Sequence, residues 1–194
     1  MNYCMTVAAG REELAAGLAP LPIAERQSLL TTVHKLVDAR GSHNADPIER
    51  RALAARSWSA AVAQQRRGET VIDEDAAAAL LTDLADVHVR DACCEWALGP
   101  DSLAAQALAR QLARRATAPW DVAPYALVAW FAWRNGEGAL SRIATEYALA
   151  SDPNCTFARL IEELLDQGVD PRAWRDPPRM GGGGGPRRSR RRGG

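Results

Sequence analysis

The sequence lacks the features that mark membrane, secreted and metal-binding proteins. Its longest strongly apolar run, residues 126–133, is too short to span a bilayer. The chain does not open with the basic, apolar and cleavage-site pattern of a signal peptide. Its four cysteines contain no C-x-x-C pair, and four in 194 residues are too few for a disulfide framework. We therefore expect a cytoplasmic protein without a membrane anchor, a metal or a cofactor.

Motifs of the common catalytic mechanisms are also missing. There is no G-x-S-x-G, P-loop or dinucleotide fingerprint. The histidines, His34, His43 and His88, have no Ser or Cys motif beside them that would mark a nucleophile. Cys93 and Cys94 follow His88 by five and six residues, spacings that do not return a helical side chain to the same face. The sequence predicts a protein that is not an enzyme.

Lysine is nearly absent, and the basic charge is unevenly distributed. Lys35 is the only lysine, and acidic and basic side chains balance at 24 each. Residues 180–194 hold five arginines and no acid, which leaves a net charge of −5 on residues 1–179. The glycine- and arginine-rich segment 176–194 has no helical periodicity and predicts a disordered tail.

The arginines of this tail form a polycation that can neutralise phosphates without reading sequence. They are Arg187, Arg188, Arg190, Arg191 and Arg192. Weak, salt-dependent nucleic-acid contact is one interpretation, although the tail lacks the repeats and aromatic residues of typical RNA-binding segments. A solubilising terminus is the simpler one. Nucleic-acid binding by the full chain and by a chain ending at Pro178 separates the two.

Strand signals are scarce, whereas helix start and stop signals recur. Residues 70–72 form a short β-branched run of note. Asp46, Pro47 and Glu49 combine a cap, a first-turn proline and an early acid, and Gly68 and Gly168 follow apolar periodic segments. Such signals predict helices over residues 22–40, 47–67, 74–84, 87–98, 102–115, 123–134, 139–150 and 156–167.

Aromatic residues concentrate in one of these segments. Trp120, Tyr125, Trp130, Phe131 and Trp133 fall within 14 residues, and apolar residues surround this helix on most sides. That pattern is typical of a central, buried helix. We expect an all-α fold, either an irregular helical bundle or a short α-solenoid-like array of helix pairs. The expected divisions are an N-terminal extension (1–10), a helical domain (11–175) and the tail (176–194).

Residues 125–153 resemble a tetratricopeptide repeat, in which bulky, small and proline positions recur across two helices. Ser141 stands where alanine is usual, and Thr145 where an aromatic residue is usual. No second copy appears at a period of about 34 residues, and one repeat is not a solenoid. The matching residues are Tyr125, Val128, Ala129, Ala148 and Pro153.

Short segments spread over the chain carry a resemblance to a known family. They are REELA (11–15), LAP (18–20), LADVHVRD (84–91), APYAL (123–127), AWFAW (129–133), GAL (138–140), DP (152–153), ARL (158–160) and LL (164–165). Together they resemble the C-terminal, helical half of the actinobacterial family called domain of unknown function 4192. The resemblance implies a helical fold and a bacterial cytoplasm, and it carries no activity or catalytic residues. The family's β-containing first half has no counterpart here, so the chain resembles a truncated or short member.

Asp86, Arg90 and Asp91 form the sharpest polar pattern and are the candidate polar interaction site. Asp86 and Arg90 are four residues apart at the start of an expected helix, a spacing that predicts an ion pair. Two interpretations remain open. The pair fixes helix packing, or Arg90 binds an anion or a carboxylate of a partner.

Repeat-like helix pairing and the missing catalytic motifs favour a non-enzymatic module that binds a protein partner in a groove between helix pairs. The alternative is the regulatory or substrate-shaping half of a larger enzyme. A β-rich, in-frame segment upstream would favour this alternative. If a docking half is missing, residues 1–21 should expose an apolar patch and promote self-association.

Overall fold

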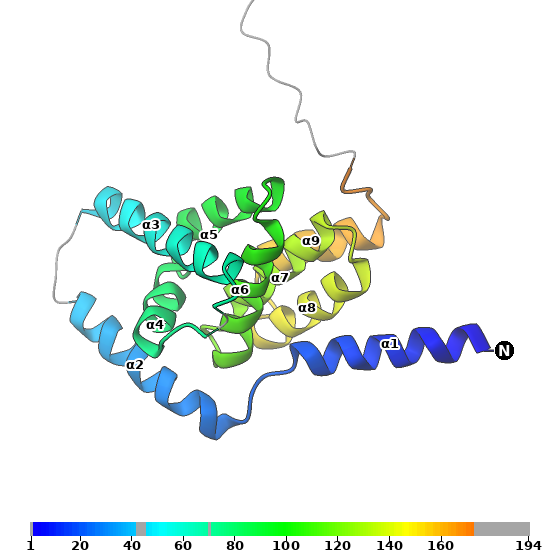
Figure 1. Ribbon diagram of the computed structural model, residues 1–194, viewed down its shortest axis with the longest axis horizontal. Coiled ribbons are helices and arrows are strands. Elements are labelled where there is room, and N and C mark those ends of the chain that lie inside the picture. Colours follow the sequence, from blue (N-terminus) through cyan, green and yellow to red (C-terminus); the bar gives the residue numbers. More distant parts are fainter. Residues whose placement is uncertain (1, 42–45, 70, 173–194) are drawn as a thin grey trace, which may run out of the picture.

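The computed structural model describes residues 2–41, 46–69 and 71–172, and every regular element within these ranges is helical (Figure 1). This confirms the all-α fold class. Within the same ranges, no helix is both long enough and apolar enough to cross a membrane. The elements are α1 (Asn2–Leu18), α2 (Ile23–Gly41), α3 (Pro47–Arg66), α4 (Glu74–Asp83), α5 (Val87–Cys94), the 3-10 turn η1 (Glu95–Leu98), α6 (Ser102–Arg115), α7 (Val122–Arg134), α8 (Gly138–Ser151) and α9 (Thr156–Asp166).

All eight helices expected from the sequence are present. The segment 87–98 is divided, since α5 ends at Cys94 and continues as η1. The side chain of Asp46 caps α3 by accepting the N–H of Ile48 at 2.9 Å. Asp101 precedes α6, but its carboxylate makes no capping bond and instead pairs with Arg66 at 3.4 Å. Helix α1 was not expected, because its segment carries two glycines and no apolar stripe.

Helix α7 is the centre of the fold, as the sequence predicted. It packs against α5, η1, α6, α8 and α9. Six of its residues are completely inaccessible to solvent: Ala126, Leu127, Val128, Ala129, Phe131 and Ala132. Helix α6 lies between α7 and α3, and α2 covers α4. The fold is therefore organised around one buried helix.

Helices α7 and α8 form a closely packed pair across a tight turn. Gly136 has a φ of +81°, a left-handed conformation that other residues rarely adopt. Ser141 is fully buried, and its hydroxyl donates to the carbonyl of Ala129 at 2.8 Å. Thr145 donates to the carbonyl of Ser141 at 2.9 Å. The helix pair over 125–153 is thus present, while its kinship with tetratricopeptide repeats stays a prediction.

Helix α1 projects from the body, which it meets along its C-terminal half, from about Arg11 to the helix end (Figure 1). Side chains of α6 and α7 hold this end by donating to backbone carbonyls. Arg110 donates to Gly17 through Nε at 2.9 Å and Nη2 at 2.6 Å, and Tyr125 donates to Leu18 at 3.2 Å. The carbonyl groups left unpaired at a helix end are thereby satisfied.

Candidate functional site

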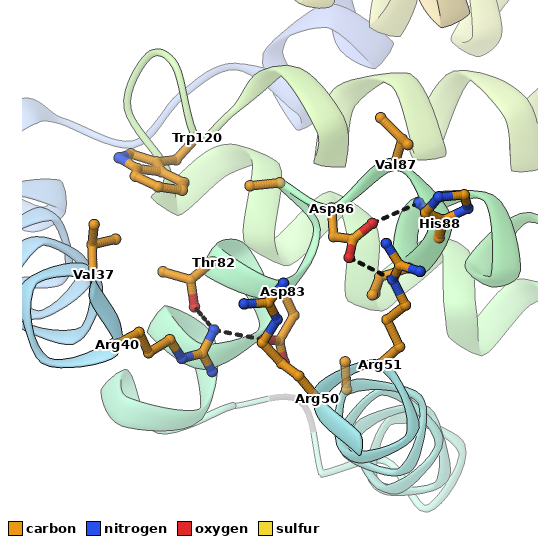
Figure 2. A pocket seen from close by; sticks show the side chains of 13 residues that line it. Val37, Arg40, Arg50, Arg51, Thr82, Asp83, Asp86, Val87, His88 and Trp120 are labelled. Carbon is orange, nitrogen blue, oxygen red and sulfur yellow. Dashed lines mark hydrogen bonds and ion pairs between the residues drawn. The ribbon is translucent and has the colours of Figure 1, made fainter. Parts of the chain in front are cut away.

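A hollow lined by several charged side chains lies where four helix ends converge (Figure 2). We call it the arginine cleft. It has a volume of about 530 Å³ between the C-terminal end of α2, the first turns of α3 and the turn joining α4 to α5. Apolar side chains, including Val37, Val87 and Trp120, flank it. Its charged and titratable lining residues are Arg40, Arg50, Arg51, Asp83, Asp86 and His88.

On one side of the cleft, Arg40 of α2 holds the end of α4. Its Nη1 donates to Asp83 Oδ1 at 2.6 Å and to Thr82 Oγ1 at 2.8 Å. The hydroxyl of Thr82 turns back to donate to the carbonyls of Ala78 and Ala79, which leaves its oxygen facing Arg40. Burial raises the pKa of the Asp83 carboxyl, although the adjacent guanidinium opposes this rise.

On the other side, Asp86 joins α3 to the start of α5. Its Oδ1 accepts the backbone N–H of His88 at 2.9 Å, which caps α5, and its Oδ2 accepts from Arg51 Nε at 2.7 Å. The hydrogen bond from Arg51 lowers the pKa of Asp86, and the backbone bond acts in the same direction. Asp86 is therefore held ionised as a fixed negative group.

Arg50 differs from the other two arginines of the cleft. It is exposed, and its side chain makes no hydrogen bond or ion pair with any residue that the structure describes. Its positive charge nevertheless acts on Asp83 and opposes the rise of that pKa. A guanidinium has five N–H groups, so Arg40 and Arg51 also keep donors beyond those used in their ion pairs. Three guanidiniums against two carboxylates leave the cleft with a net positive charge suited to an anion.

The structure divides the predicted site between two sides of α5. Asp86 lines the arginine cleft, whereas Arg90 and Asp91 line a shallow hollow of about 460 Å³ with Trp130 and Phe157. Asp86 therefore lines a different hollow from Arg90 and Asp91.

The predicted ion pair between Asp86 and Arg90 is wrong. Arg90 pairs with its neighbour Asp91 at 2.7 Å, and its guanidinium lies 4.8 Å from the ring centroid of Phe157. The physical reason is the role of Asp86 as a cap. Its carboxylate turns toward the helix start and Arg51, away from the residue one turn later.

Three cysteines lie in the part of the chain whose side chains the structure describes. Cys93, Cys94 and Cys155 are free thiols, so the adjacent pair does not form a disulfide. Burial raises the pKa of the Cys94 thiol to about 12 and that of Cys93 further, which disfavours a nucleophilic thiolate. Among the residues described, no cluster of three or more His, Cys, Asp or Glu could hold a metal ion.

Arg40, Arg50 and Arg51 were not among the residues predicted from the sequence. One signal was available: Arg50 and Arg51 stand near the start of α3, where positive charge opposes the helix dipole. Cations in that position suggest a local anionic partner, and for Arg51 this is Asp86. The tail arginines, Arg187, Arg188, Arg190, Arg191 and Arg192, lie outside the described residues.

Together, the fold and the cleft define an all-helical domain with an arginine-lined hollow between helix ends. The family model described as "Domain of unknown function (DUF4192)" matches residues 4–172, so the chain belongs to this family. The resemblance seen in the sequence is thereby confirmed. Neither a curated protein nor a solved structure matches the chain.

Proposed function

We propose that the protein is a non-enzymatic interaction module of the bacterial cytoplasm that binds an acidic segment of a partner protein in the arginine cleft. The observation that carries this proposal is the exposed guanidinium of Arg50. It stands beside two further arginines, without a carboxylate of its own among the described residues. A carboxylate from a partner would supply the missing negative charge, because arginine presents paired donors that match its geometry.

The apolar side chains that flank the cleft favour a protein segment as its ligand. Val37 and Val87 are exposed apolar residues, and both flank the cleft together with the half-buried Trp120. A partner with a carboxylate next to an aliphatic or aromatic side chain would cover this apolar surface while its charge meets Arg50. Burial of apolar surface contributes about 25 cal/mol per Å², so such a segment binds better than a free small anion.

Calorimetric titration with a short peptide of alternating glutamate and leucine tests this proposal. We expect the full chain to bind this peptide and to show no binding to a matched peptide in which lysine replaces glutamate. Arg50→Ala should weaken binding about tenfold, since charged hydrogen bonds contribute roughly 1.5–3 kcal/mol and part of that is lost to solvent. Higher salt should weaken binding further.

Arg56→Ala is the matched control, since Arg56 is also exposed on α3 but does not line the cleft. Both variants retain the tail arginines, so any attraction between the tail and the peptide is equal in the two titrations. Equal affinity of the two variants would contradict the proposal, as would equal binding of the glutamate and lysine peptides.

A further inference from the structure

A second hollow lies beside the projecting helix α1, away from the arginine cleft. We call it the α1–α6 groove. Its main part has a volume of about 780 Å³ and is lined by Leu14, Val71, Leu103 and Arg110 among others. It continues past Leu14 and Arg110 into a hollow of about 660 Å³ that reaches Gly10. The groove therefore follows α1 from Leu14 back to Gly10, about one helical turn.

We propose that the α1–α6 groove receives α1 of a second copy of this chain, so that two chains pair about a two-fold axis. The apolar lining is the first observation behind this proposal. Leu103 is 68% exposed and Val71 80% exposed, and Leu14 is also exposed. Three large apolar side chains gathered in one groove indicate a surface that is covered in an assembly.

The position of α1 is the second observation. The helix contacts only α8 and α6 to an appreciable extent, and its N-terminal end points away from the body (Figure 1). Most of the stability of a helix in a protein comes from packing against other elements. An antiparallel second α1 lying in the groove would supply that packing.

Charge complementarity identifies a second copy as the occupant. Three arginines of α6 line the groove, and all of them donate to backbone carbonyls rather than forming ion pairs with described carboxylates. The acceptors are Gly17 for Arg110, Ala19 for Arg114 and Ile72 for Arg115. In the main part of the groove their positive charges face Glu137, which accepts from Gln106, and Glu13 of α1 lines the continuation of the groove.

Helix α1 carries the opposite charge. Arg11 is neutralised by Glu146 of α8 at 2.8 Å, whereas Glu12 and Glu13 are exposed and form no ion pair with a described residue. In a two-fold pair, the carboxylates of each α1 meet the arginines of the other chain's groove. Because α1 and the groove are adjacent, one self-complementary patch supplies both halves of the contact, as an isologous interface requires.

Sedimentation velocity of the full chain across a wide concentration range tests this inference. We expect a reversible monomer–dimer equilibrium that weakens at high salt. Leu103→Glu, which places a charge in the groove at an exposed position, should raise the dimer dissociation constant at least tenfold. The double variant Glu12→Ala, Glu13→Ala should also raise it, and it changes no buried residue.

Ile48→Glu is the matched control, because Ile48 is 74% exposed on α3 and does not line the groove. It should leave the dissociation constant unchanged. Circular dichroism establishes that each variant is folded before it is compared. A monomer at all concentrations would overturn the inference. So would open-ended oligomers, or a dimer that Leu103→Glu and Ile48→Glu affect equally.

Discussion

The guanidinium of Arg110 lies so close to Gly17 that a methyl group at this position would stand 2.5 Å from Nη2. Arg110 uses this proximity to donate twice to the Gly17 carbonyl, at 2.9 and 2.6 Å. Gly17→Ala should therefore displace the guanidinium and break a charged hydrogen bond. We expect the free energy of unfolding to fall by about 1 kcal/mol, measured by urea denaturation.

Gly10 provides the control for this prediction. It lies in the same helix, and a methyl group there would contact nothing within 4 Å. Gly10→Ala should raise the free energy of unfolding by about 0.5–1 kcal/mol, because alanine loses less conformational entropy in a helix. If both variants shift stability in the same direction by the same amount, the contact with Arg110 does not stabilise the end of α1.

Asp83 and Asp86 should respond to pH in opposite directions. The pKa of Asp83 is raised by burial, so the folded state holds its proton more tightly than the unfolded state. Its contribution to stability is fully present below the ordinary aspartate pKa of about 3.9 and is lost as pH rises through the raised value. Asparagine does not ionise, so Asp83→Asn avoids the cost of a buried negative charge. The free energy of unfolding of the variant should therefore rise relative to that of the wild type as pH increases from 3 to 7.

For Asp86 the pKa is lowered, mainly by its hydrogen bond from Arg51. The ionised group stabilises the fold above a pH of about 3.9, and this contribution disappears as pH falls through the lowered value. Asp86→Asn should therefore be less stable than the wild type at pH 7 and approach it near pH 3. Urea unfolding at both pH values checks the pair, and parallel pH profiles for the two variants would refute this assignment.

Ser141 should tolerate a smaller residue but not a larger one. It is fully buried where α8 approaches α7, and its hydroxyl bonds the carbonyl of Ala129. Ser141→Ala should cost about 1 kcal/mol, the net contribution of one hydrogen bond. Ser141→Leu should cost roughly 1–3 kcal/mol or more through overpacking. Thermal unfolding compares them, and a leucine variant as stable as the alanine variant would show that the helices are not in close contact.

The helices could be predicted because their signals are local. Asp46 and Pro47 start α3, and Gly136 makes the turn between α7 and α8. Helix α1 was not predicted, because its glycines and scattered apolar residues do not form a periodic apolar face. What holds its end in place is Arg110, 93 residues further along the chain.

The arginine cleft could not be predicted for a related reason. Arg40 and Asp83 are 43 residues apart, and Arg51 and Asp86 are 35 apart, so only the folded chain brings them together. The local spacing of Asp86 and Arg90 suggested an ion pair, but the capping bond to His88 and the guanidinium of Arg51 compete for the same carboxylate. The hydrogen-bond and ion-pair partners of residues at helix ends therefore cannot be read from helical periodicity in the sequence.

We propose that the positive charge of Arg50 recognises a negatively charged partner, and charge reversal tests this proposal most directly. Affinities of the glutamate–leucine and lysine–leucine peptides are measured for the wild type and for Arg50→Glu. We predict that the wild type prefers the glutamate peptide, and that Arg50→Glu loses this preference or reverses it, while Arg56→Glu keeps it. If Arg50→Glu and the wild type show the same preference, the arginine cleft is not the binding site.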